Sequence, residues 1–308
     1  MKEFRLPPVI TLSIIIIGCV ASPTRIDKAR LLSHVETLSS DIYMGRQTGT
    51  DGGIMAQTYV KNEMEIMNLN PCLETLQQPF SFNSRRSETQ FAGVNMVGIV
   101  EGTGSSVKTM AVTAHFDHLG TRNEAVYNGA DDNASGTAAM LEIARYFTLN
   151  PPVHTIIFAG LDAEEMGLQG ARALVDSPCI MEREVAIDFN MDMISRSTKG
   201  ELYVSGTRHY PGTKAVLEDL SPREGLTLLL GHDEPGTGSE DWTSASDHGP
   251  FHQADIPFLY FGVEDHPGYH QPTDDFQDIT PEFYYQAAEL ILETILKFDA
   301  QLDSISFK

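Results

Sequence analysis

Apolar residues recur every three or four positions in several stretches of the chain, which indicates helices with one buried face. The expected helices are 25–40, 51–68, 133–148, 167–175 and 281–298. Short runs rich in Val, Ile, Ala and Phe lie between them and predict strands. The expected strands are 92–101, 108–114, 153–159, 184–190, 201–205, 226–231 and 257–262. Strands that alternate with helices imply the α/β class, a twisted and mostly parallel central sheet flanked by helices.

The chain reads as one domain, because no internal repeat, heptad array or low-complexity linker divides its 308 residues. That length suits a single large domain with a substantial core, which we expect over residues 25–300. The Gly- and acid-rich stretch 231–250 is the longest expected loop. Long loops in compact domains often form functional lids or rims.

The first 19 residues have the layout of a secretory signal peptide. Lys2 and Arg5 precede an apolar stretch over 9–20, which is shorter than the roughly 20 residues of a membrane-spanning helix. The stretch ends in Ile-Ile-Gly-Cys and resembles a bacterial lipobox, whose cysteine, here Cys19, carries lipid. We therefore expect an exported protein, periplasmic or held to the outer membrane by this lipid. The alternative is an ordinary cleaved signal with an incidental cysteine.

Charge and cysteine usage narrow the possible partners. The chain has 21 Lys and Arg against 43 Asp and Glu, a net charge of −22. This excess disfavours nucleic acid or an anionic membrane as a partner, so we expect membrane contact only through the lipid. Cys72 and Cys179 remain, and their separation in sequence leaves open whether they pair. The sequence does not specify an oligomeric state.

Acidic and imidazole residues lie at the ends of the apolar runs. They are His115, Asp117, Asp131, Glu164, Glu165, Asp192 and His270. The carboxyl ends of parallel strands meet at one edge of a sheet, so these side chains should converge there. Imidazoles and carboxylates together suit zinc, and a bridging carboxylate can hold two ions about 3.5–4 Å apart. The pattern therefore predicts a metallohydrolase.

The first pair has a further expected role. His115 and Asp117 are two positions apart, so on an extended segment their side chains point to the same side. The Asp117 carboxylate could then accept a hydrogen bond from the imidazole nitrogen that does not face the metal, which fixes the tautomer of the ligand. We accordingly count Asp117 with the catalytic residues.

Six ordered blocks resemble the co-catalytic zinc aminopeptidases of family M28. They are HFDHLG (115–120), NGADDNASG (128–136), LDAEEMGLQG (161–170), NMDM (190–193), SDHGPF (246–251) and GYHQPTDD (268–275). Two earlier segments, GRQTGTDGG (45–53) and NMVGIVEG (95–102), are similar to the family's usual lead-in. The resemblance spans about residues 25–300, and a single HxD or EE motif would be weak in comparison.

The resemblance implies two zinc ions per chain and assigns roles to individual residues. The implied ligands are His115, Asp131, Glu165, Asp192 and His270. Asp131 would bridge both ions, with a cis peptide bond just after it. Glu165 and His270 would complete one site, and His115 and Asp192 the other. Glu164 would be the general base, while His118 and His248 receive no metal role.

The implied activity is that of an exopeptidase, which removes N-terminal residues from peptides with a free N-terminus by means of a zinc-activated water. A glutaminyl cyclase is one alternative, since this related transferase uses a single zinc on the same fold. A metal-free binding relative of the fold is another. The number of bound zinc ions separates these three hypotheses, and the preferred N-terminal residue stays open.

Overall fold

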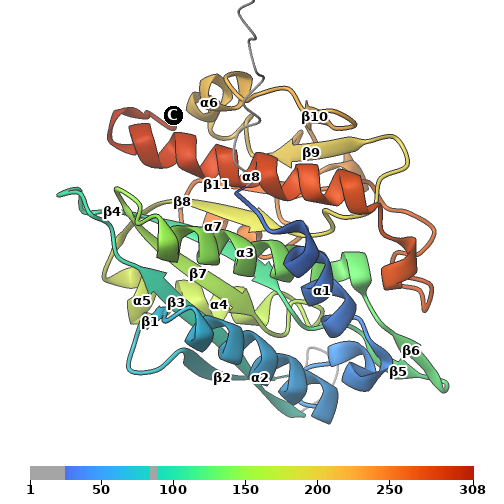
Figure 1. Cartoon of the computed structure of the whole chain (residues 1–308). Helices are drawn as coiled ribbons and strands as arrows, with labels where there is room; N and C mark the ends of the chain where they lie inside the picture. The colour runs from blue at the N-terminus through green and yellow to red at the C-terminus, as the bar shows by residue number, and fades with distance from the viewer. Residues whose placement is uncertain (1–24, 84–88) are drawn as a thin grey trace, which may run out of the picture.

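The centre of the molecule is a sheet of four adjacent parallel strands (Figure 1). In spatial order they are β7 (Thr155–Leu161), β4 (Lys108–His115), β8 (Glu184–Met191) and β11 (Phe258–Gly262). Both faces of these strands are covered, which explains why they are nearly continuous apolar runs. The structure is a computed structural model that describes residues 25–83 and 89–308.

Antiparallel strands extend the sheet at both edges. On one side β3 (Gln90–Val100) pairs with β7, and β1 (Asn70–Pro71) and β2 (Gln77–Asn83) pair with β3. On the other side β9 (Glu201–Ser205) runs antiparallel to β11, and β10 (Thr227–Leu230) runs parallel to β9. The predicted α/β domain is therefore confirmed, with a sheet of mixed direction whose parallel part lies at its centre.

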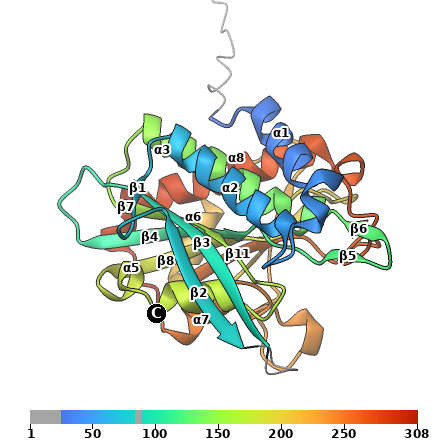
Figure 2. The same ribbon diagram turned by 90° about the horizontal axis from the view of Figure 1, so that it is seen from below.

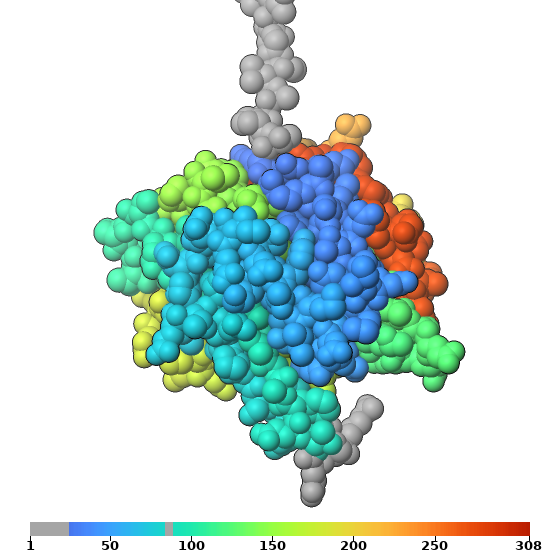
Figure 3. Space-filling model, turned by 60° about the horizontal axis from the view of Figure 1, so that its bottom comes forward, coloured from blue at the N-terminus to red at the C-terminus, as the bar shows by residue number. Residues whose placement is uncertain are grey.

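Helices cover both faces of the sheet (Figure 2). One layer contains α1 (Lys28–Leu38), α2 (Asp51–Ile66), α3 (Gly136–Leu149) and α8 (Pro281–Gln301). The opposite layer contains α4 (Gln169–Val175), α5 (Pro178–Met181) and α7 (His248–Gln253). The short α6 (Lys214–Glu218) packs beside α8. Figure 3 shows α1 and α2 side by side on the surface of the first layer.

One helix start agrees with the expected position and another differs. The helix expected from residue 51 is α2, and its N-cap is Thr50, whose Oγ1 accepts the Gly53 N–H. The helix expected from residue 133 begins at Gly136, because residues Ala130–Ser135 form a separate turn, η2, with a cis peptide bond between Asp132 and Asn133. Local geometry of this kind leaves no trace in apolar periodicity.

Short elements were also missed. The sequence did not predict β1, β2 or the hairpin of β5 (Gly120–Arg122) and β6 (Ala125–Tyr127). Strands of two or three residues carry no measurable period, and β2 is mostly exposed at the sheet edge. These elements extend the edges without changing the layered architecture.

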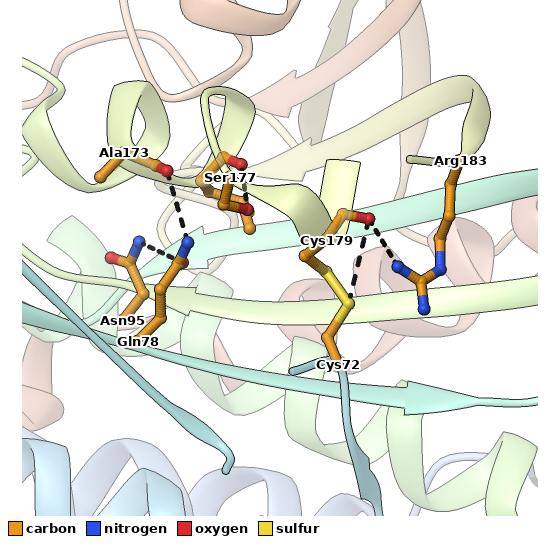
Figure 4. Close-up of a disulfide and its surroundings, with 8 residues drawn as sticks. Cys72, Gln78, Asn95, Ala173, Ser177, Cys179 and Arg183 are labelled. Atoms are coloured by element: carbon orange, nitrogen blue, oxygen red, sulfur yellow. Dashed lines mark hydrogen bonds between the residues drawn. A yellow bond between two sulfur atoms is a disulfide. The ribbon is translucent and has the colours of Figure 1, made fainter. Parts of the chain in front are cut away.

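A disulfide joins the two cysteines that the sequence left open. Cys72, next to β1, bonds to Cys179 in α5, with their Cα atoms 5.7 Å apart (Figure 4). Arg183 donates a hydrogen bond to the Cys179 carbonyl. The bond links an edge strand to the opposite helix layer across 107 residues of chain.

The expected signal peptide, residues 1–19 with Cys19 at its end, lies outside the described residues. Within residues 25–83 and 89–308, no helix has both the length and the apolar character needed to cross a membrane.

Candidate metal centre

The predicted site residues meet at the carboxyl edge of the parallel strands. His115 is the last residue of β4, Asp192 directly follows β8, and Glu164 and Glu165 lie in the turn after β7. His270 comes from the loop between β11 and α8. A cavity of about 350 Å³ opens here, and its lining includes Glu164, Glu165, Asp192 and His270. Three strand ends and the loop after β11 thus build one site, as the alternating pattern indicated.

The first group of donor atoms surrounds the His115 imidazole, which is fully buried. Its Nε2 lies 3.3 Å from Asp192 Oδ1 and 3.5 Å from Asp132 Oδ1. Neither Nε2 nor Asp192 Oδ1 makes a hydrogen bond to the part of the chain that the structure describes. We name these three residues the first metal position.

The second group uses the other oxygen of the same aspartate. Asp132 Oδ2 lies 3.2 Å from His270 Nε2, which in turn lies 3.4 Å from Glu165 Oε2. We name Asp132, Glu165 and His270 the second metal position. One carboxylate therefore faces both groups.

The carboxylate that faces both groups is that of Asp132 and not that of Asp131, the residue expected to bridge two ions. Asp131 Oδ1 accepts hydrogen bonds from the N–H and the hydroxyl of Ser195, both at 2.7 Å. Its Oδ2 lies 3.0 Å from His266 Nε2. These contacts turn the Asp131 side chain away from the cavity, while its neighbour Asp132 points into it. The expected cis peptide bond is likewise displaced by one residue.

Hydrogen bonds to the Asp274 carboxylate hold the turn that contains Asp132. The Asp274 carboxylate is buried and accepts the backbone N–H groups of Asp131 and Asp132, each at 3.0 Å. Two adjacent aspartates in a sequence look alike, so only the path of this turn decides which one faces the cavity.

The donor distances fit zinc. Tetrahedral zinc with ligands at 2.0–2.1 Å places those ligands about 3.3–3.4 Å from one another. The four contacts within the two positions measure 3.3 and 3.5 Å around His115 and 3.2 and 3.4 Å around His270. Imidazole nitrogen and carboxylate oxygen are also the donor types that zinc takes in catalytic sites. Both positions can therefore hold a zinc ion.

The Asp117 carboxylate does not accept the expected hydrogen bond from the His115 imidazole. The nitrogen Nδ1 of His115 lies 3.2 Å from the Asp117 backbone carbonyl but 3.7 Å from the carboxylate Oδ1, which is too long for a hydrogen bond. Oδ1 instead accepts the backbone N–H of Glu164 at 3.0 Å, and Oδ2 lies 3.4 Å from that of Glu165. Asp117 therefore holds the turn that carries both glutamates.

The electrostatics of the two glutamates differ. Burial raises the pKa of the Glu164 carboxyl well above its usual range, with His115 opposing this shift. Burial also acts to raise the pKa of Glu165, but the nearby His118 and His270 rings outweigh it and hold that pKa below its usual range. The pKa values of these two adjacent carboxylates are thus shifted in opposite directions, as expected for a base beside a metal ligand.

Two residues of the site, His118 and Arg46, received no role from the sequence pattern. His118 is 1% exposed, and its Nδ1 lies 2.7 Å from Glu165 Oε1. Arg46 is fully buried and donates to the carbonyls of Leu38, Phe116, Asn128 and Gly129. The segment GRQTGTDGG (45–53) contains this arginine, but its sequence does not indicate that the side chain is fully buried.

Gly45 explains part of that block. Its φ is +67°, and a Cβ at this position would lie 2.4 Å from the Tyr127 carbonyl oxygen. Only glycine fits so close an approach at a positive φ. The next residue, Arg46, can therefore enter the space between the loops that follow β4 and β6.

The sequence is similar to those of an aminopeptidase and of several other named proteins. Aminopeptidase YwaD of Bacillus subtilis (strain 168) is 32% identical over 200 residues, which cover 60% of this chain and 40% of that protein. The alkaline phosphatase isozyme conversion protein of Escherichia coli (strain K12) is 24% identical over 152 residues, 46% of this chain and 43% of that one. The chain thus spans less than half the length of both relatives.

Solved structures share the fold. The zinc aminopeptidase BSAP from Bacillus subtilis superposes with a TM-score of 0.71 at 19% identity, over 91% of this chain and 96% of that one. LapB from Legionella pneumophila gives 0.69 at 18% identity, over 89% and 72%. The family model described as Peptidase family M28 matches residues 95–295, which contain every residue of both metal positions. This protein therefore belongs to peptidase family M28.

Proposed function

We propose that this protein is a zinc-dependent aminopeptidase, which hydrolyses the first peptide bond of substrates with a free N-terminus. The observation that carries the proposal is the pair of donor groups that share the Asp132 carboxylate in one cavity with Glu164. A site for a single ion would need only one of these groups. Family membership supports the same reading.

The chain supplies three donors to each ion. His115, Asp132 and Asp192, whose donor atoms lie close together, would hold the first zinc. Asp132, Glu165 and His270 would hold the second, on the distances from His270 Nε2 to the two carboxylates. When bound, the two ions lower the pKa of water and polarise the scissile carbonyl. The fourth place at each zinc would remain open for water or substrate, as in other catalytic zinc sites.

Glu164 is suited to move the proton. It lines the cavity together with Asp132, Glu165 and Asp192, and burial raises its pKa, which increases its affinity for a proton. It would accept a proton from the attacking water as the new C–O bond forms. It would then give that proton to the leaving nitrogen as the C–N bond breaks. Asp117 supports this step by holding the Glu164 backbone N–H.

The cavity also offers a reason for exopeptidase action. Its charged lining is acidic apart from His270, and it includes Asp265 as well as the carboxylates of the two metal positions. Negative charge of this kind attracts the ammonium group of a free N-terminus. Met193, Trp242 and Tyr260 add an apolar wall that can take the first side chain. Peptides with a free N-terminus are therefore the proposed substrates.

The test is a set of peptides whose products are identified by mass. We expect loss of N-terminal residues from free peptides, no reaction with their N-acetylated forms, and inhibition by chelators that added zinc reverses. Conversion of N-terminal Gln to pyroglutamate without hydrolysis would favour the cyclase alternative. Protein that binds no zinc and reacts with no peptide would favour a metal-free binding relative.

We also propose that the protein is exported and carries lipid on Cys19. The lipobox-like Ile-Ile-Gly-Cys sequence motivates this proposal, and the Cys72–Cys179 disulfide supports it because such bonds persist in oxidising compartments. Cys19→Ser should move the protein from the detergent-extracted membrane fraction to the soluble one. Unchanged partitioning would contradict a lipid anchor.

A further inference from the structure

His118 stands outside the ligand set but touches it. The residue lies in the loop after β4, it is 1% exposed, and Nδ1 lies 2.7 Å from Glu165 Oε1 and 3.8 Å from Asp132 Oδ2. Neither ring nitrogen makes a hydrogen bond of regular geometry to the described residues. Burying an imidazole without polar partners is costly. The polar purpose of this side chain must therefore lie toward the two carboxylates.

The two oxygens of Glu165 face different imidazoles. Oε2 lies 3.4 Å from His270 Nε2, a spacing that suits two ligands of one zinc ion. Oε1 lies 2.7 Å from His118 Nδ1, which is shorter than the roughly 3.3 Å between tetrahedral ligands and in the range of an N–H···O contact. The short distance favours a donor beside the ligand, although the ring is not aligned for a hydrogen bond. Donor atoms of His118, Asp132 and Glu165 also lie close enough together to hold an ion, so the test below separates the two roles.

The surroundings keep the ring in this place. A Cβ at position 129 would lie 2.5 Å from His118 Cδ2, so Gly129 leaves just enough room for the imidazole. The His118 backbone N–H points to the Arg46 carbonyl at 3.4 Å. Both the side chain and the backbone of His118 are thus packed by the loops that shape the metal centre.

We propose that His118 is a positioning residue for the second metal position, where it donates to Glu165 Oε1 and directs Oε2 toward the zinc. This inference rests on the proposed two-zinc centre. It adds a residue to which the family resemblance gives no role. Partners that orient a ligand in this way typically change metal affinity by about 10–100-fold when they are removed.

The test compares His118→Leu with His118→Asn by zinc titration of the zinc-free protein against a competing chelator. His118→Leu should bind the first zinc normally and the second about 10–100-fold more weakly. His118→Asn should keep an affinity close to that of the unaltered protein, because its amide Nδ2 can donate from the place of Nδ1. An amide is a poor zinc ligand, so this rescue separates positioning from coordination.

His34→Leu is the matched control. His34 is also a buried imidazole, 3% exposed, with Nε2 3.4 Å from a carboxylate oxygen of Glu142, but it lies in α1 and takes no part in the metal centre. Both zinc affinities should be unchanged in this variant. Thermal unfolding of each zinc-free variant reports whether it is folded.

Two results would overturn the inference. The first is a second-zinc affinity in His118→Leu equal to that of the unaltered protein. The second is a loss in His118→Asn as large as in His118→Leu, which would make the imidazole a ligand. A single zinc in the unaltered protein would instead contradict the proposed two-zinc centre itself.

Discussion

Replacing Arg46 by lysine should destabilise the protein, although charge is conserved. The guanidinium is fully buried and joins three segments: the end of α1, the loop after β4 and the residues before η2. Burial lowers its pKa to about 10, so it stays charged at neutral pH. Nε donates to the Phe116 carbonyl, Nη1 to those of Leu38 and Asn128, and Nη2 to that of Gly129.

The magnitude follows from the carbonyls that lysine cannot reach. An ammonium group has its three donors on one atom, whereas the guanidinium spreads its donors over a rigid plane. If Nζ takes the place of Nη1, the Phe116 carbonyl loses its partner, whereas the Gly129 carbonyl keeps the N–H of Ala134 at 3.2 Å. A buried acceptor without a partner costs about 1–3 kcal/mol, so Arg46→Lys should lose about 1–3 kcal/mol. That is a substantial part of the roughly 5–15 kcal/mol of a typical domain.

The assay is urea unfolding of the zinc-free protein, with free energies obtained by linear extrapolation. Arg208→Lys is the control, because this side chain is 55% exposed and its nearest carboxylate, on Glu234, lies 3.6 Å away. It should change the free energy of unfolding by less than about 0.5 kcal/mol. Equal stabilities of Arg46→Lys and Arg208→Lys would refute the reasoning.

Three further predictions test the site and its support. Glu164→Gln should retain zinc but lower kcat by about 10²–10⁴-fold, as measured by elemental analysis and steady-state kinetics. Asp132→Asn should lower the affinity for both zinc ions in a chelator titration, whereas Asp131→Asn should keep the shared ligand and lower both affinities less. A larger loss of affinity in Asp131→Asn than in Asp132→Asn would instead make Asp131 the bridge. Burial lowers the pKa of His248 from its usual 6.5 to about 4 in the folded protein. Below pH 6.5 the unfolded chain therefore binds more protons than the folded one, and the free energy of unfolding decreases as the pH is lowered. This group should cost about 2 kcal/mol between about pH 8 and about pH 5, a slope that urea unfolding of zinc-free His248→Asn should lack.

Periodicity and composition were sufficient for the architecture and for the location of the site. The apolar runs that became β4, β7 and β8 are buried on both faces, so their sequence reflects their environment directly. Polar residues directly after such runs, including His115 and Asp192, had to meet at one sheet edge. His270 lies eight residues beyond the end of β11, so its place at the site depends on the path of the loop before α8 as well as on the strand order.

The remaining details depend on loop geometry that has no period. Asp131 and Asp132 differ only in the direction that η2 gives them, and Asp274, far along the chain, fixes that direction. From its sequence Arg46 would be expected at the surface, because the carbonyls that bind its guanidinium come from three segments far apart in the chain. His118 follows the predicted pair of His115 and Asp117 but needs the position of Glu165 to acquire a role. Contacts of this kind exist only after the chain has folded.

The most direct test of the central claim is a crystal structure of the zinc-loaded protein with anomalous data collected at the zinc edge. The account predicts two peaks about 3.5–4 Å apart, one on each side of the Asp132 carboxylate. The first should contact His115 and Asp192, and the second Glu165 and His270. A single peak, or two peaks bridged by another residue, would contradict the shared role of Asp132 and the hydrolytic mechanism built on it.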